Sequence, residues 1–355
     1  MKSRDHIYKE AVKLLNELIS IPSLSGEEDR TAHCIERFLK AHGRNTKRKF
    51  NNVWSVCNNC DENAPVLLLN SHHDTVKASG KWSHDPCQPV TTSEQLFGLG
   101  SNDAGASVVS LMAAFLYFSD LPKLPYRLII ALTGEEEISG PKGISSILEE
   151  LGHIDLAIVG EPTEMQMAIA EKGLMVLDCL SVGKAGHAAR DEGDNAIYGA
   201  MKDIHFLQNH TFPDISSWLG PVKMTVTQIN AGHQHNVVPA KCDFVVDIRT
   251  NELYNNQEVL QFVQQNVDAK VSARSLRLNS SSIALDHPIV QRGQELGLSN
   301  FGSPTLSDQS LMDFTSIKIG PGKSSRSHTE DEFILLSEIK EGIETYVKLL
   351  TELKI

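Results

Sequence analysis

The sequence predicts an α/β protein in which a mainly parallel sheet carries helices on both faces and a smaller α+β domain is inserted into the larger one. Its 355 residues exceed what one hydrophobic core ordinarily holds, so two domains are expected. Short apolar runs alternate with segments of helical periodicity up to residue 172, which is typical of a parallel sheet. The pattern changes over residues 173–281 and then returns. We therefore predict one domain of residues 1–172 and 282–355, with residues 173–281 inserted into it.

The first domain is predicted to begin with two helices. Residues 7–19 place apolar side chains at helical spacing, and Pro22 marks the exit. Ser25-Gly26-Glu27-Glu28 indicates a capping box that opens a second helix, which continues to about Leu39.

Strands and helices then alternate. Apolar runs that are short enough for buried strands lie at residues 53–56, 66–69, 127–133 and 156–160. Residues 107–118 are apolar all round, so a helix there should be buried against a sheet. Residues 144–151 predict a further helix.

The inserted region has a different order of elements. We predict strands at residues 174–182, 222–229, 242–249 and 271–278, and helices at residues 195–207 and 257–267. This βαββαβ order is that of a ferredoxin-like domain. After it, a strand at residues 317–320 and an amphipathic last helix at residues 339–350 return to the first domain.

Composition limits the function. The 45 acidic and 33 basic residues give a formal charge of −12, which opposes binding to nucleic acid or to an anionic membrane. No apolar run is long enough to span a membrane, and the N-terminal residues lack the apolar stretch of a secretory signal, so we expect a cytoplasmic protein. The six cysteines are then expected as thiols, and Cys57-Asn58-Asn59-Cys60 has no second CxxC to complete a zinc site.

Histidine and carboxylate residues follow several of the predicted strands or a glycine turn. These residues are His72 with Asp74, Asp103, Glu135 with Glu136, and Glu161. Because the carboxyl ends of parallel strands share one edge of a sheet, these side chains should converge. Converging carboxylates repel one another unless cations hold them, so a metal site is expected, and imidazole with oxygen donors suits zinc, cobalt or manganese. One carboxylate of the Glu135–Glu136 pair would bind metal while its neighbour takes a proton from water.

These motifs resemble those of the M20 metallopeptidase family over most of the chain. In chain order they are Ser71-His72-His73-Asp74-Thr75-Val76, Gly98-Leu99-Gly100-Ser101-Asn102-Asp103, Thr133-Gly134-Glu135-Glu136-Glu137, Val159-Gly160-Glu161-Pro162-Thr163, Gly186-His187-Ala188, Asn236-Val237-Val238-Pro239 and Ser327-His328-Thr329-Glu330-Asp331-Glu332-Phe333. Within the family, the chain most resembles the acetylornithine deacetylase and succinyl-diaminopimelate desuccinylase branch, because it has Glu161 where aminopeptidase relatives tend to have Asp.

The resemblance implies a site with two divalent metal ions per chain, zinc first, with cobalt or manganese as alternatives. Asp103 would bridge them, with His72 and Glu161 on one ion. Glu136 and His328 would bind the other ion. The remaining implied roles are Asp74 orienting His72 and Glu135 acting as the general base.

The resemblance also implies roles for the inserted domain. His187 would reach the site of a partner subunit and steady the oxyanion, which implies a homodimer built through this domain. Asn236 and Arg249 would contact the substrate, with Arg249 on its α-carboxylate. A surface ion pair is the equally weighted alternative for Arg249.

The function expected from these features is metal-dependent deacylation of a small N-acyl amino acid, with N-acetylornithine as the leading substrate. The alternatives on the same scaffold are a succinyl-diaminopimelate desuccinylase and an aminopeptidase. A different class, a metal-bearing protein that binds an amino acid without turnover, also stays open. Two departures, Ala104-Gly105-Ala106 where many relatives have lysine and Lys77 where many have proline, leave the proposed ligands intact but weaken a subfamily assignment.

Overall fold

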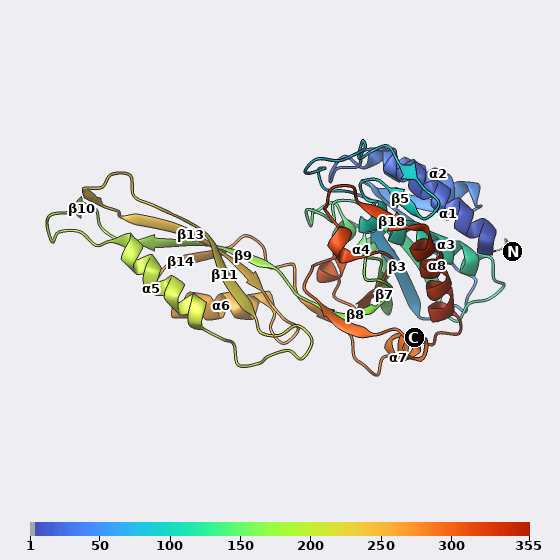
Figure 1. The fold of residues 1–355 in the computed structure, drawn as a ribbon. Coiled ribbons are helices and arrows are strands. Elements are labelled where there is room, and N and C mark those ends of the chain that lie inside the picture. The colour runs from blue at the N-terminus through green and yellow to red at the C-terminus, as the bar shows by residue number, and fades with distance from the viewer. Residues whose placement is uncertain (1–3) are drawn as a thin grey trace. The chain divides into compact units, whose positions relative to one another are not determined.

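The computed structural model describes residues 4–355 and divides the chain into two compact units (Figure 1). The first unit comprises residues up to Ile169, Ile283–Phe301 and Ser307–Ile355, and the second comprises Ala170–Ser282 and Gly302–Leu306. Residues 302–306 thus join the second unit, whereas the sequence placed them in the first domain. Residues 1–3 lie outside the described residues. The expectation that the chain lacks an export signal rests in part on these residues.

A central sheet organises the first unit, although residues 170–171, 281–282 and 302–303 of its strands are counted with the second unit. Its strands run in the order β1-β2-β6-β3-β7-β17-β8-β15, and β16 pairs with β8. The bounds are β1 Thr46–Lys49, β2 Asn52–Cys57, β3 Val66–His72, β6 Arg127–Thr133, β7 Leu156–Val159, β8 Met167–Glu171, β15 Ser281–Ser282, β16 Asn300–Ser303 and β17 Ser316–Lys318. The four middle strands, β6, β3, β7 and β17, pair in parallel. The predicted mainly parallel sheet is therefore confirmed.

Helices and a small sheet surround these strands. The helices are α1 Arg4–Ile19, α2 Asp29–Ala41, α3 Ala106–Ser119, α4 Leu148–Leu151, α7 Pro288–Glu295 and α8 Leu336–Leu350. Helices α3 and α8 pack with Leu67 and Leu69 on one face of β3, whereas Leu151 of α4 packs with Val66 and Leu68 on the other face. A separate three-stranded sheet consists of β4 Val90–Thr91, β5 Gln95–Phe97 and β18 Phe333–Leu335.

Helix α3 shows why the sequence forms this layered core. Almost all of its side chains are buried, because it packs against the sheet as well as against α1 and α8. The prediction of a buried helix here is confirmed, and the cause is the absence of a polar face. The helix expected at residues 144–151 is shorter, since Ile144–Ser146 forms a 3-10 turn before α4 begins.

The predicted capping box at Ser25 is wrong. Helix α2 begins at Asp29 after an N-cap residue, Glu28, whose side chain makes no cap hydrogen bond. The Ser25 hydroxyl instead donates to Asp74 Oδ2 at 2.7 Å. A local motif was thus overridden by a contact to a residue 49 positions away.

The second unit has the βαββαβ order. Its elements are β9 Met175–Val182, α5 Ala196–Asn209, β11 Lys223–Ala231, β13 Lys241–Arg249, α6 Asn256–Asn266 and β14 Lys270–Ala273. The antiparallel sheet has the strand order β11-β13-β9-β14 and its own hydrophobic core with α5 and α6. A two-stranded ribbon pairs β10 Gly186–His187 with β12 Val237–Val238. Among residues 4–355, no helix combines the length and apolarity needed to cross a membrane.

Candidate metal centre

The site forms at the edge where three parallel strands end. Strand β3 ends at His72, which is in register with Thr133 at the end of β6, and Asn70 is in register with Val159 at the end of β7. The turns after these strands therefore start side by side. They bring His72, residues 135–137 and Glu161 to one edge, as the sequence predicts.

His72 is the centre of the first group of side chains. It is 1% exposed, and its Nε2 atom lies 3.3 Å from Asp103 Oδ1, 3.8 Å from Glu136 Oε2 and 3.7 Å from Glu161 Oε1. Its other ring nitrogen, Nδ1, lies 3.1 Å from the Asp74 carbonyl oxygen and 3.3 Å from Asp74 Oδ1. Asp74 therefore fixes the ring so that Nε2 faces the carboxylates.

His328 lies on the opposite side of Asp103. Its Nε2 atom is 3.0 Å from Glu137 Oε2 and 3.6 Å from Asp103 Oδ2. Asp103 thus turns one carboxylate oxygen toward His72 and the other toward His328. This places a shared carboxylate between two histidine and carboxylate pairs.

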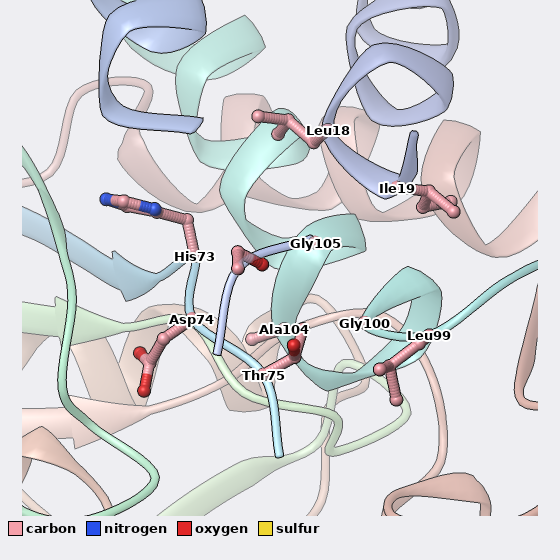
Figure 2. Close-up of a pocket in the computed structure, with 10 residues that line it drawn as sticks. Leu18, Ile19, His73, Asp74, Thr75, Leu99, Gly100, Ala104 and Gly105 are labelled. Atoms are coloured by element: carbon pink, nitrogen blue, oxygen red, sulfur yellow. The ribbon is translucent and has the colours of Figure 1, made fainter. Parts of the chain in front are cut away.

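Asp74 also holds the turn that carries the glutamates. Its carboxylate accepts hydrogen bonds from the backbone N–H groups of Glu136 and Glu137, each at 3.1 Å. Figure 2 shows the His73 ring and the Asp74 carboxylate extending in different directions from the loop after β3, beside a cavity of about 20 Å³. The His73 ring lies 2.9 Å from both Thr31 Oγ1 and the Asn51 carbonyl oxygen, so it packs away from the cluster.

The structure places the Glu135 carboxylate outside the cluster, and its role as the general base stays a prediction. The Glu135 carboxylate accepts a hydrogen bond from the Lys142 backbone N–H at 2.9 Å, and it lies against Gly140. Glu135 has a left-handed backbone with φ 57°, and the turn after it points Glu136 and Glu137 toward the histidines. Glu137 takes the place beside His328 that the sequence reasoning gave to Glu136. The run of three glutamates offered this residue, but the resemblance alone did not fix which members enter the site.

Burial of several carboxylates together has a large electrostatic effect. Burial raises the pKa of Glu161 to about 8, and Asp103 adds to this rise. Burial also raises the pKa of Glu136 and that of Glu137 above the usual range of a glutamate. The hydrogen bond between His328 and Glu137 raises the pKa of His328 to about 9. Without cations, the cluster therefore retains protons that ligation would have to remove.

The donor set fits divalent metal ions. Two triads, His72 with Asp103 and Glu137, and His72 with Glu136 and Glu161, bring ligand atoms within 4.8 Å of one another. Glu161 Oε1 is buried and accepts no hydrogen bond from any described residue, although buried carboxylate oxygens ordinarily have a partner. Imidazole and carboxylate donors suit zinc, manganese or cobalt. These residues could hold two such ions with Asp103 between them.

Further buried charges surround the cluster, and sequence reasoning gave them no role. Glu332 accepts hydrogen bonds from the backbone N–H groups of Gly100, Asn102 and Asp103 and so holds the turn before α3. Asp308 accepts a hydrogen bond from Thr133 Oγ1 at 2.8 Å. Glu332 lies in the quoted motif Ser327–Phe333, but the resemblance gave it no role, and Asp308 lies in no motif and follows no predicted strand.

The other predicted site residues lie in the second unit. His187 and Asn236 are exposed and adjacent, because β10 pairs with β12 and the Ala188 backbone N–H donates to the Asn236 carbonyl oxygen at 3.0 Å. The Arg249 guanidinium donates two hydrogen bonds to Asp247, at 2.8 and 3.1 Å. Arg249 therefore forms the ion pair that was its alternative assignment, and its role in substrate binding stays a prediction.

Comparisons with known proteins show what this chain is similar to in sequence and in fold. Succinyl-diaminopimelate desuccinylase 2 of Ruegeria sp. (strain TM1040) is 26% identical over 280 residues, which cover 73% of this chain and 69% of the relative. A peptidase M20 domain-containing protein of Schizosaccharomyces pombe is 25% identical over 351 residues, which cover 96% of this chain and 84% of the relative. In fold, the chain is similar to the aminopeptidase PepT of Bacillus cereus, with a TM-score of 0.76 at 16% identity, covering 97% of this chain and 98% of that one. A dinuclear metal-binding M20 peptidase of Bacillus subtilis has a TM-score of 0.74 at 15% identity and 98% coverage of both chains.

The fold and the cluster together define an α/β protein of two units with a candidate site for divalent metal ions. The sequence profile of peptidase family M20/M25/M40 matches residues 68–352, and the chain belongs to this family. The predicted family resemblance is thereby confirmed. The chain is an amidohydrolase of this family, and the relatives described above are named as desuccinylases and peptidases.

Proposed function

We propose that this chain hydrolyses the amide bond of a small N-acyl amino acid by means of two divalent metal ions. The observation that carries the proposal is the position of Asp103 between two histidine and carboxylate pairs. A single-ion site would need only one such pair. The presence of a further carboxylate, Glu136, beside the first pair supports catalysis over simple binding.

The proposed ligands follow from the distances. His72 and Glu161 would hold one ion, Glu137 and His328 the other, and Asp103 both. Zinc is the first candidate, with cobalt and manganese as alternatives, because ligand type alone does not select among them. The assignment keeps four of the five predicted ligands and replaces Glu136 by Glu137.

Glu136 is then the proposed general base, in place of Glu135. When bound, the two ions supply Lewis-acid chemistry that lowers the pKa of a water molecule and polarises the amide carbonyl. Glu136 takes a proton from the water as its oxygen attacks the amide carbon, and delivers that proton to the amine nitrogen as the C–N bond breaks. The products are a carboxylate and a free amino acid. Asp74 holds the Glu136 backbone N–H and the His72 ring, so it positions base and ligand together.

The relatives favour a succinyl substrate. The sequence alone pointed first to N-acetylornithine, whereas the similar proteins of Ruegeria and Caulobacter are named succinyl-diaminopimelate desuccinylases. Acetylornithine deacetylase activity has no support from these relatives. We therefore place N-succinyl amino acids first, with N-acetyl amino acids and short peptides as alternatives.

A matched substrate panel tests this proposal. Amine release should be measured from N-succinyl and N-acetyl forms of diaminopimelate, ornithine and citrulline, with short peptides alongside, after loading with zinc, cobalt or manganese. The proposal predicts turnover of at least one N-acyl amino acid, with the succinyl form of a pair preferred. Tight binding of these compounds without turnover by the loaded protein would instead support the non-catalytic alternative.

We also propose a homodimer formed through the second unit. Strand β11 is an edge strand with mostly exposed side chains, and it lies beside α5, on which Tyr198 and Met201 are 71% and 58% exposed. An unpaired strand next to exposed apolar side chains is a suitable surface for a second copy. In such a dimer, exposed His187 would act at the metal site of the partner.

A further inference from the structure

Residues 23–31 form a strap across the turns that carry the metal cluster. The Thr75 backbone N–H donates to the Ser23 carbonyl oxygen at 2.8 Å, and the Ser25 hydroxyl donates to Asp74. The strap then runs past Gly134 into helix α2. It therefore contacts the segment after β3 as well as the segment after β6.

Glu28 is the buried charge of this strap. Its side chain has no exposed surface and forms no ion pair with any described residue. Its Oε1 atom accepts hydrogen bonds from the backbone N–H groups of Gly26 at 2.6 Å and Glu135 at 3.0 Å. Its Oε2 atom accepts one from Asn51 Nδ2 at 2.7 Å. An unpaired buried carboxylate is costly, and these donors are what make it tolerable here.

The hydrogen bond from the Glu135 backbone N–H to Glu28 lies at the start of the turn formed by residues 135–137, called the glutamate turn. Glu135 has a left-handed backbone, and the two following residues are the proposed base and ligand. Asp74 accepts the N–H groups of Glu136 and Glu137, while Glu28 accepts that of Glu135. The three consecutive N–H groups of the turn are thus held by two buried carboxylates. A side chain at Gly134 would press against Glu28, so the two segments are in close contact there.

We infer that Glu28 is a positioning residue for the metal centre: it fixes the Glu135 backbone so that Glu136 and Glu137 enter the cluster while Glu135 stays outside. The inference rests on the proposed roles of Glu136 and Glu137. It assigns no contact between Glu28 and metal or substrate. Its effect passes through the backbone of the turn.

The hydrogen-bond pattern permits a donor and acceptor exchange as the test. Glu28→Gln keeps one oxygen for Gly26 and Glu135, but its amide group would face the Asn51 amide donor. Asn51→Asp alone would set two carboxylates against each other. In the original chain, Arg48 donates to Asn51 Oδ1 at 3.1 Å. In the double variant, the amide at position 28 donates to one oxygen of the carboxylate at position 51, and the other oxygen still accepts from Arg48. The double variant therefore restores every bond with the charge moved.

Cobalt binding to the metal-free protein is the primary measurement, because it needs no turnover. We expect Glu28→Gln and Asn51→Asp each to weaken the binding of the second cobalt ion. Each should also lower kcat by about 10- to 100-fold, the usual effect of changing a residue that supports a metal ligand, with KM little changed. The double variant should recover both to within a few-fold of the original chain. Thr31→Val, which removes a buried hydroxyl of the same strap but no bond to the glutamate turn, is the control and should leave cobalt affinity unchanged.

Either of two results would overturn the inference: unchanged cobalt affinity and kcat in a folded Glu28→Gln protein, or no recovery in a folded double variant. If Glu28→Gln does not fold, Asn51→Asp against the double variant makes the same comparison. A separate outcome is that the original chain turns over none of the acyl substrates while the variants still show the expected changes in cobalt affinity. That result would refute the proposed substrate class and would support the positioning role of Glu28.

Discussion

Glu136 and Glu135 are adjacent residues with opposite surroundings, which makes them a matched pair for mutation. Glu136 faces His72, whereas Glu135 is bound to the Lys142 backbone. We predict that Glu136→Gln retains two metal ions per chain and loses about 10²- to 10⁴-fold in kcat, the usual contribution of a general base. Glu135→Gln should stay within a few-fold of the original kcat. Metal analysis and steady-state kinetics on both variants check this, and the reverse pattern would return the base to Glu135.

Protonation of the metal-free cluster predicts a pH dependence of metal binding. The pKa of Glu161 is raised to about 8 by burial, and that of His328 to about 9 by its bond to Glu137. At pH 7 both groups hold a proton that a cation must displace, so apparent affinity should rise with pH and level off above about pH 9. Calorimetry at pH 7 in buffers of different ionisation enthalpy should detect the released protons. His328→Ala should release fewer, and equal release by both proteins would contradict the assignment.

At the scale of elements, helix α5 and strand β11 determine the proposed assembly. Replacing the exposed Tyr198 and Met201 of α5 by aspartate should give a folded monomer, because charge would be buried against the second copy. Sedimentation at micromolar concentration measures the change, and Gln261→Asp, at an exposed position of α6, is the control. If His187 serves the partner, the monomer also loses activity. A native chain that sediments as a monomer would refute the dimer.

At the scale of the whole molecule, the two units have separate cores, and the metal cluster lies entirely in the first. We predict two calorimetric unfolding transitions, of which chelation lowers only the one that belongs to the first unit. A cation at 100 times its Kd stabilises by about 2.7 kcal/mol, so removal should lower that transition by roughly 5–10 °C. The second transition is the internal control. An equal fall in both would show that the units unfold together.

The sequence by itself determined the elements and most of the chemistry. Apolar runs at the correct length specified β3, β6 and β7, because buried parallel strands need such runs, and their ends marked His72 and Glu161. The glycine turn before it marked Asp103, and only His328 was found through the resemblance, which gives the order of motifs along the chain but not the direction of a side chain.

Only the tertiary structure decided which glutamates enter the site. Adjacent carboxylates in a turn point in different directions, and the direction depends on the backbone angle of Glu135 and on the carboxylates that accept its neighbours' N–H groups. Glu28 and Asp74, far apart in the chain, supply those acceptors. For the same reason the Ser25 capping box was predicted but not formed, since its hydroxyl finds Asp74 across the fold. Local sequence patterns specify whether a segment forms a helix, a strand or a turn. Contacts between distant segments specify which of several adjacent side chains enters the metal site.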